Sequence, residues 1–406
     1  MSMRSRNVLL WEEGSQNGYN SLMLPLPTAD PLWIATPQAL QQMTNSIAAE
    51  PMLAIDTESN SLFAYKERVC LVQISTPAVD YLIDPLAIDD LSPLAPLFAN
   101  PTQQKIFHAA EYDLICLKRD YSFTFSNIFD TMIAARILGE GQIGLGSLLS
   151  VNFSIEQEKK YQRANWGKRP LSEAMLDYAR MDTHYLFALK ALFEEKLKQK
   201  RLWKLAQEDF RLVCGVDLPS VEPNGNSCWK VSGGAKLSPR ETAILQSLCV
   251  YRDKQARNMD LPLFKVLSNK LLVDLSRNAP HTKAELQRVP GMSERLFKRH
   301  AEELLKVIES GEKATPPTRQ PRQRPDKALL DRLNSLHEWR KEQGKLLKVE
   351  SDIILPRNYM EKIAVQNPSS SAELKYIMTD IPWRYQHYGN DILKRLHNLE
   401  EHENTF

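Results

Sequence analysis

The stretch Leu53-Ala54-Ile55-Asp56-Thr57-Glu58 is an apolar run that ends in two acids. A run of this kind is typical of a buried β-strand, in which successive side chains point to opposite faces. Because Asp56 and Glu58 are two residues apart, this alternation places both carboxylates on the same face. The stretch therefore predicts a buried strand that presents a pair of acids at one place.

Two further acids and a tyrosine follow along the chain. Asp113 comes shortly after a β-type run at residues 105–107, in a segment that we expect to be helical. Tyr178 and Asp182 are four residues apart within a helical sequence at residues 173–193, so both side chains lie on one helix face. The sequence thus supplies four carboxylates and one tyrosine in three separate motifs.

Convergent carboxylates are the ligands that hard divalent cations such as Mg²⁺ or Mn²⁺ prefer. Two such ions about 3.5–4 Å apart bind the attacking and leaving oxygens of a phosphoryl displacement. The acids therefore favour metal-dependent hydrolysis of a phosphodiester. Since an ordinary tyrosine has a pKa of about 10, Tyr178 suits the orientation of a metal-activated water, or a base whose pKa the ions lower, better than a free-standing base.

Each motif alone also has an ordinary structural explanation. An Asp-x-Glu at the end of a strand is usually a solvated edge or a helix N-cap, and a Tyr-x-x-x-Asp helix is a weaker signal still. The order, spacing and context of the three motifs together favour a catalytic site.

In these motifs the chain resembles a known family. Residues 40–212 resemble the ribonuclease D branch of the DEDD 3′-to-5′ exonucleases, in the subtype that contains a tyrosine. The resemblance is carried by Asp56-Thr57-Glu58, His108-Ala109-Ala110-Glu111-Tyr112-Asp113-Leu114, Phe129-Asp130-Thr131, Gly144-Leu145-Gly146-Ser147-Leu148-Leu149, Trp166-Gly167-Lys168-Arg169-Pro170-Leu171 and Asp177-Tyr178-Ala179-Arg180-Met181-Asp182.

The resemblance implies a role for each residue of the proposed site. Asp56, Glu58 and Asp182 would hold one metal ion, and Asp56 would also touch a second. Asp113 would support that second ion largely through water, and Tyr178 would position the nucleophilic water. No catalytic carboxylate is missing, which argues against a degenerate pseudo-enzyme.

Strand and helix signals alternate in the first half of the chain and predict an α/β domain with a mixed sheet at residues 36–212. This is compatible with a ribonuclease-H-like sheet whose acids gather at one edge. Residues 1–35 are polar and proline-containing, and we interpret them as an N-terminal extension. The expected elements are a helix at 36–49 and strands at 52–56, 69–75, 80–83 and 105–107.

Beyond a linker at 213–235 the chain repeats itself. Tyr251-Arg252 recurs as Trp339-Arg340 and Pro280 as Pro368, a constant offset of 88 residues. The repeat predicts two homologous all-α units, each of which resembles the HRDC domain shared by RecQ-type helicases and ribonuclease D. Their predicted bounds are 236–311 and 327–406, and the linker at 312–326, rich in proline and arginine, should be extended and flexible.

Several residues are candidates for contacts with nucleic acid. Residues 156–169 interleave basic and aromatic side chains, which suits single strands because phosphates take the cations and bases stack on the rings; a solvated loop is the alternative. Leu62 and Phe63 either pack against terminal bases or belong to the core, and Gly291 precedes a basic helix whose first amides suit a phosphate. The full set of candidates is Leu62, Phe63, His108, Lys160, Arg163, Trp166, Lys168, Arg169 and Gly291.

Composition limits the choice of partners and location. With 52 basic and 50 acidic residues the net charge is only +2, so affinity for nucleic acid must come from local patches. Five scattered cysteines without a Cys-x-x-Cys favour reduced thiols. No apolar run approaches the roughly 20 residues of a membrane span. We therefore expect a cytoplasmic protein, without a membrane partner, that acts as a monomer.

The resemblance implies a 3′-to-5′ exoribonuclease that releases nucleoside 5′-monophosphates from small structured RNAs, with tRNA precursors foremost. A DNA 3′-to-5′ exonuclease would use the same acids, and only contacts to the terminal 2′-hydroxyl would discriminate. A non-catalytic RNA-binding protein is the alternative of another class, but it would be expected to lose its carboxylates. A helicase and a nucleotide cofactor are excluded because Gly-x-x-x-x-Gly-Lys-Ser/Thr does not occur.

Overall fold

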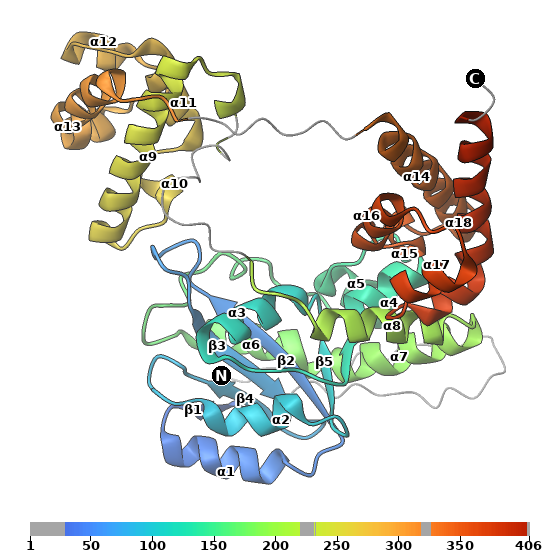
Figure 1. Cartoon of the computed structure of the whole chain (residues 1–406). Helices are drawn as coiled ribbons and strands as arrows, with labels where there is room; N and C mark the ends of the chain where they lie inside the picture. Colours follow the sequence, from blue (N-terminus) through green and yellow to red (C-terminus); the bar gives the residue numbers. More distant parts are fainter. Residues whose placement is uncertain (1–28, 220–230, 232, 318–325, 404–406) are drawn as a thin grey trace.

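The computed structural model describes residues 29–219, 231, 233–317 and 326–403. An α/β domain comes first, and two helical units follow it at separate places above the sheet (Figure 1). Cys228 and most of the two predicted linkers, at 220–230 and 318–325, lie outside the described residues. No helix in the described ranges is both long enough and apolar enough to cross a membrane.

The α/β domain contains a mixed sheet of six strands in the order β1-β4-β3-β2-β5-β6, as the sequence predicted. Strand β2 pairs antiparallel with β3 and parallel with β5, so it lies inside the sheet. Leu53 and Ile55 join one apolar core and Ala54 joins the other, which buries both faces of β2. The strands are β1 (Leu32–Ile34), β2 (Met52–Ser59), β3 (Val69–Ser75), β4 (Asp80–Ile83), β5 (Gln104–Phe107) and β6 (Ile128–Asp130).

Two expectations about the first domain were wrong in detail. Residues 32–34 are not part of an extension, because they form β1 and pair parallel with β4; three residues are too few for a strand pattern to be recognised. The predicted helix at 173–193 is two helices, since α6 packs on β2, β3 and β4 whereas α7 packs on α4 and β5. The chain changes direction at Tyr185 between them.

The helices of this domain surround the sheet. The helix expected after Thr36 is confirmed, with the Thr36 side chain accepting a hydrogen bond from the Ala39 amide. The helices are α1 (Pro37–Ile47), α2 (Ala95–Ala99), α3 (Glu111–Tyr121), α4 (Thr131–Leu138), α5 (Leu145–Phe153), α6 (Glu173–His184), α7 (Leu186–Gln199) and α8 (Trp203–Cys214).

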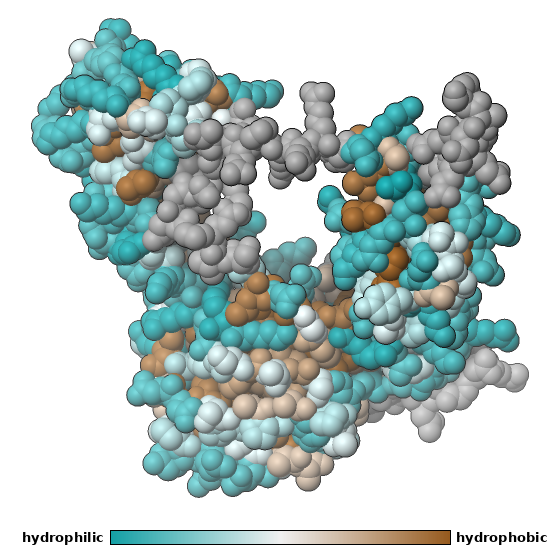
Figure 2. All heavy atoms as spheres, in the orientation of Figure 1, coloured by the Kyte–Doolittle hydropathy of each residue, from teal (hydrophilic) through white to brown (hydrophobic). Residues whose placement is uncertain are grey.

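The two helical units have matching elements, and each helix of the second begins 88 residues after its counterpart. The first unit contains α9 (Pro239–Met259), α10 (Leu263–Val266), α11 (Asn269–Asn278), α12 (Lys283–Arg288) and α13 (Glu294–Lys313). The second contains α14 (Lys327–Leu347), α15 (Ser351–Ile354), α16 (Arg357–Gln366), α17 (Ser371–Ile377) and α18 (Pro382–Glu403). Hydrophilic side chains cover much of the surface of both units on the face shown in Figure 2.

The second unit packs directly on the α/β domain. Arg384 of α18 is fully buried and donates hydrogen bonds to Glu208, Asp209 and the Ile353 carbonyl. Arg136 of α4 forms ion pairs with Glu350 and Asp352 of the second unit. These contacts make the second unit and the α/β domain one packed body.

Candidate active site

The first two acids project from the end of β2. Its pairing with β5 covers Met52 to Ala54 only, so Asp56 and Glu58 lie beyond that neighbour. Both remain paired to β3, and an irregularity between Glu58 and Ser59 then interrupts the ladder. Both carboxylates therefore lie together at the end of β2, as the sequence predicted. This part of β2 extends past its last pair with β5.

Asp113 reaches the same place from the first turn of α3. The turn before this helix has Ala109 at a φ of 63°, a conformation that is unusual for a side chain other than glycine. Asp130 stabilises it by accepting hydrogen bonds from the Ala109 and Ala110 amides at 3.1 and 2.7 Å. Asp130 also accepts from two amides at the start of α4, so it caps that helix as expected. The Thr57 hydroxyl donates to Asp113.

Tyr178 and Asp182 come from one face of α6, as their spacing predicted. The Gln157 side-chain amide donates a hydrogen bond to the Asp182 carboxylate. The Tyr178 ring lies 5.9 Å from Tyr161 and 6.1 Å from Trp166, measured between ring centroids.

The four carboxylates repel one another in a poorly solvated place. Burial, followed by the charge of Asp182, raises the pKa of Asp56 well above its usual value. Burial and Asp56 do the same to Glu58 and to Asp113, and burial raises the pKa of Asp182 to about 7. Among the described residues no Lys, Arg or His forms an ion pair with any of the four. The site therefore holds negative charge that a cation would compensate.

The donor set fits divalent ions, although the side chains are not yet arranged around one. Within the described ranges, no group of three or more His, Cys, Asp or Glu side chains stands ready to hold a metal ion. Two of the acids are hydrogen-bonded within the protein, Asp182 to Gln157 and Asp113 to Thr57. Carboxylate oxygens are nevertheless the ligands that Mg²⁺ and Mn²⁺ prefer, so the chemistry of the donor set suits such an ion.

Tyr178 is neutral in this environment. Burial, followed by the charges of Asp182 and Glu58, raises the pKa of its hydroxyl above the usual value. A hydroxyl that keeps its proton does not act as a free-standing base, but it can hydrogen-bond a water molecule. The orienting role of Tyr178, and its alternative as a base whose pKa the ions lower, stay predictions.

The four acids and Tyr178 line an open pocket of about 570 Å³. Leu62 and His108 also lie on its wall. The His108 ring nitrogen Nδ1 lies 2.9 Å from the Thr131 hydroxyl, and burial lowers the pKa of the imidazole. His108 therefore presents a neutral, hydrogen-bonded ring to the pocket.

Two candidate contacts with nucleic acid have many partners within the protein, and their roles stay predictions. Trp166 belongs to the lining of the pocket but is only 1% exposed and packs beside the Tyr178 ring. The Arg169 guanidinium donates hydrogen bonds to Asp84 and to the carbonyls of Cys70 and Trp166. Its donors are therefore used within the protein. The basic and aromatic spacing of this segment did not distinguish buried members from exposed ones.

The remaining candidates stay predictions. Lys160, Arg163 and Lys168 are exposed but do not line the pocket. Phe63 faces Lys265 of the first helical unit, whose ammonium lies 3.9 Å from the ring centroid. Gly291 has a φ of 88° in the turn before α13, where the two following amides already donate to carbonyls of the turn.

Sequence reasoning also missed several residues of the pocket. Gln157, Lys159, Gln162 and Tyr112 all line it. They lie in loops or at a helix start, where no periodic pattern marks a functional side chain. The signal that the sequence gave for residues 157–162 was their place inside the segment 156–169 of interleaved basic and aromatic residues.

Together the α/β fold, the four acids with a tyrosine and the repeated helical units define the class of metal-dependent 3′-to-5′ exonucleases with accessory helical domains. Comparison with known proteins agrees. A family model described as 3'-5' exonuclease matches residues 31–198, and the HRDC domain model matches residues 241–308 and 330–396.

Relatives identify the family. Ribonuclease D of Desulfotalea psychrophila is 31% identical over 255 residues, which cover 62% of this chain and 68% of that protein. Protein RRP6-like 3 of Arabidopsis thaliana is 31% identical over 279 residues, 63% of this chain but 31% of that protein. The chain thus spans about a third of the length of its RRP6-like relatives. The crystal structure of Escherichia coli RNase D shares the fold, with a TM-score of 0.67 at 22% identity over 91% of this chain and 99% of that one.

The chain belongs to the ribonuclease D family. Its fold class, an α/β exonuclease domain followed by two HRDC domains, is confirmed. The 3'-5' exonuclease model and the ribonuclease D relatives support the predicted class of 3′-to-5′ exoribonuclease. Exonucleases with this set of acids use divalent metal ions.

Proposed function

We propose that the protein removes nucleotides singly from the 3′ end of RNA and releases nucleoside 5′-monophosphates with the help of two Mg²⁺ or Mn²⁺ ions. One observation carries the proposal: four acids without a compensating cation, of which Asp113 and Asp182 are buried and Asp56 and Glu58 half-buried, line a pocket of about 570 Å³. A volume of this size is in the range of small-molecule sites. It accommodates a terminal nucleotide and its phosphate.

Each residue then has a defined task. When bound, the ions supply positive charge to the scissile phosphate and lower the pKa of a bound water. Asp56, Glu58 and Asp182 hold one ion, while Asp56 and Asp113 hold the other. Tyr178 keeps its proton and orients the attacking water by a hydrogen bond.

Other pocket residues bind and position the substrate. Leu62 is 37% exposed on the pocket wall and packs against the terminal base or sugar. Lys159 is exposed at the pocket and attracts the phosphate of the preceding nucleotide. Both residues act on binding more than on the chemical step.

The natural substrates that we propose are the 3′ ends of structured small RNAs, tRNA precursors foremost. The Escherichia coli neighbour is described as an exoribonuclease involved in structured RNA processing, and two HRDC domains suit extended contacts with RNA. The acids alone serve RNA and DNA equally, so preference for RNA depends on contacts to the 2′-hydroxyl. A monomeric state and a cytoplasmic location stay predictions.

A time course on 5′-labelled RNA and DNA of one sequence tests the proposal. With Mg²⁺, the RNA should shorten stepwise from its 3′ end, and chelator or Asp182→Asn should stop the reaction. Asp274→Asn is the matched control, because Asp274 lies on α11, outside the pocket, and pairs with Lys270, whose side chain is 78% exposed. Cleavage within the strand, or from the 5′ end, would contradict the proposal. A preference for DNA would favour the alternative, a DNA 3′-to-5′ exonuclease.

A further inference from the structure

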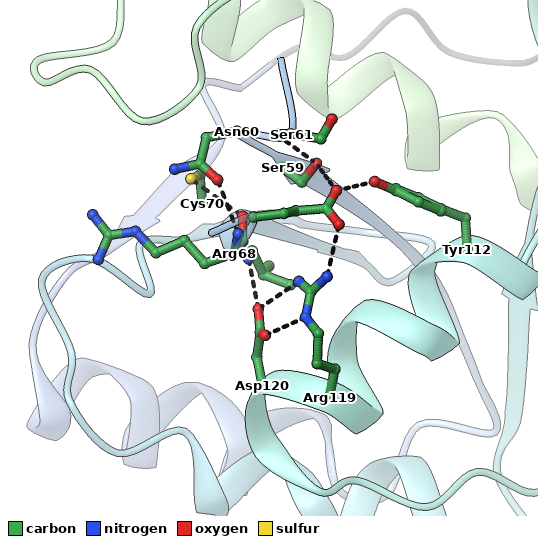
Figure 3. Close-up of polar contacts among 10 residues, drawn as sticks. Ser59, Asn60, Ser61, Arg68, Cys70, Tyr112, Arg119 and Asp120 are labelled. Carbon is green, nitrogen blue, oxygen red and sulfur yellow. Dashed lines mark hydrogen bonds and ion pairs between the residues drawn. The ribbon is translucent and has the colours of Figure 1, made fainter. Parts of the chain in front are cut away.

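The connection between β2 and β3, residues 60–68, is fastened at its base to the elements that carry the catalytic acids. Glu67 accepts hydrogen bonds from Ser59 at the end of β2 and from Tyr112 and Arg119 of α3, with Arg119 at 2.7 Å (Figure 3). Asp120 of α3 accepts from the Val69 amide at 2.8 Å. The base of the connection is thus fixed to β2 and α3.

The tip of the same connection is held by the first HRDC domain. The Tyr65 hydroxyl donates to Asp253 at 2.7 Å, and the Tyr65 amide donates to Asp260 at 3.0 Å. Arg257 donates to the Tyr65 hydroxyl at 3.2 Å, and the Tyr65 ring packs on the apolar core of this HRDC domain. We call Tyr65 with Asp253, Arg257 and Asp260 the latch.

The latch supplies the hydrogen bonds that join the first HRDC domain to the α/β domain. Among the described residues, every hydrogen bond between the α/β domain and the first HRDC domain involves Tyr65. The Lys265 ammonium over the Phe63 ring adds a contact beside it. Phe63, which the sequence offered as a base-stacking residue, thus presents one ring face to the HRDC domain.

The middle of the connection faces the pocket. Ser61 and Leu62 lie between the fixed base and the latched tip, and both line the pocket with the acids. Only two residues separate Leu62 from Tyr65, so a shift of Tyr65 is transmitted to Leu62 through a short segment whose base is held to β2 and α3. The placement of the HRDC domain and the placement of Leu62 are therefore coupled.

We propose that the first HRDC domain, through the latch, positions Leu62 for contact with the 3′-terminal nucleotide, and that Tyr65 is a positioning residue for the exonuclease reaction. This inference rests on the proposed function of the pocket. It differs from RNA binding by the HRDC domain itself, because the latch acts even on a substrate too short to reach that domain. Tyr65 touches no substrate and acts only through Leu62.

The experiment compares Tyr65→Phe with Tyr376→Phe. The first change removes the hydroxyl from Asp253 and Arg257 but keeps the ring. The second removes a hydroxyl from a side chain that is 82% exposed on the second HRDC domain. Steady-state kinetics are measured on a ribodinucleotide, which fills only the pocket, and on a long single-stranded RNA, with hydrogen exchange of residues 60–68 as a readout independent of activity.

Tyr65→Phe should raise KM for the dinucleotide about tenfold, the effect of losing a hydrogen bond to a charged group, with kcat within about twofold. Exchange of residues 60–68 should become faster, and Tyr376→Phe should change neither quantity. In a Leu62→Ala background the effect of Tyr65→Phe on KM should disappear, because the side chain through which it acts is gone.

Three results would overturn the proposal. An unchanged KM for the dinucleotide despite faster exchange would make the latch a packing contact only. A change confined to the long RNA would show that the HRDC domain binds RNA without positioning Leu62, and an undiminished effect in Leu62→Ala would exclude action through Leu62. If the wild type and Tyr376→Phe also leave RNA intact, the proposed function itself fails, and this inference fails with it.

Discussion

The two HRDC domains share one fold but are attached to the exonuclease domain in different ways. The second contributes Ile353 to a core of the α/β domain and buries Arg384 against Glu208 and Asp209. The first reaches the α/β domain through the latch at Tyr65. One helical scaffold therefore serves as a fixed structural part in one copy and as a contact to the active-site connection in the other.

A few side chains at equivalent positions explain the difference. With the offset of 88 residues, Arg384 of the second domain corresponds to Leu296 of the first, and Asp352 corresponds to Phe264. The first domain therefore lacks the charges that dock the second on α4 and α8. The comparison teaches that the attachment depends on single residues rather than on the fold.

The largest effect should come from Arg384→Met. Glu208 would keep its charge in a buried place without its partner, which costs about 3–5 kcal/mol of stability. The matched change Leu296→Met in the first domain should cost less than about 1.5 kcal/mol, because it nearly conserves volume. Chemical denaturation of both variants measures the difference, and equal losses would contradict the contrast between the domains. Adding Glu208→Gln to Arg384→Met should restore part of the stability.

A second prediction concerns the pH dependence of Mg²⁺ affinity, which depends on the acids of the site and not on the attachment of the HRDC domains. Asp182 keeps its proton up to a pKa of about 7 when no metal is bound, and a metal ion needs the ionised carboxylate. Affinity for Mg²⁺ should therefore fall at least about tenfold per pH unit below 7, because the other acids of the site also have raised pKa values and must lose protons as well. Calorimetric titration from pH 5 to 8, a range of roughly three units around that value, measures this.

The same shift has an opposite effect on the metal-free protein. An acid whose pKa is raised by folding binds more protons in the folded state, so stability falls as the pH rises toward 7. Arg384→Met should keep this pH dependence, because Arg384 does not contact the acids. A metal affinity that does not change with pH would contradict the assignment of Asp182 as a ligand.

The smallest effect should come from Arg136→Gln. Its partners Glu350 and Asp352 are largely exposed, with side chains 67% and 45% accessible. Exposed pairs contribute about 0–1 kcal/mol, and salt screens them. Denaturation at low and high salt should show a small loss that shrinks with salt. A loss as large as that of Arg384→Met would show that this pair, rather than the buried one, docks the second domain.

The candidate catalytic residues could be located from the sequence because regular structure makes them periodic. Asp56 and Glu58 follow strand alternation, and Tyr178 and Asp182 follow the helical repeat. The helical repeat was visible because the apolar and arginine positions recur along the chain, and buried Arg252 and Arg340 both donate to equivalent carbonyls, those of Leu267 and Leu355.

The rest depends on tertiary contacts that the local sequence does not contain. From the sequence, Trp166 and Arg169 are expected to be exposed contacts for nucleic acid. In the structure Trp166 is buried, and Arg169 is surrounded by carbonyls and a carboxylate. Gln157 reaches Asp182 from a loop, and Tyr65 finds its partners almost two hundred positions away. No spacing rule connects residues so far apart.

The most direct test of the account is the unfolding of the wild type and of Asp56→Asn in chelator and in Mg²⁺. Burial, followed by the charges of the neighbouring acids, raises the pKa values of Asp56, Glu58 and Asp113, so replacing one acid by a neutral amide should stabilise the metal-free protein. In chelator Asp56→Asn should therefore be the more stable protein, and Mg²⁺ should stabilise the wild type alone and reverse the order. If Asp56→Asn is less stable in chelator and Mg²⁺ leaves the wild type unchanged, the acids are not a metal site.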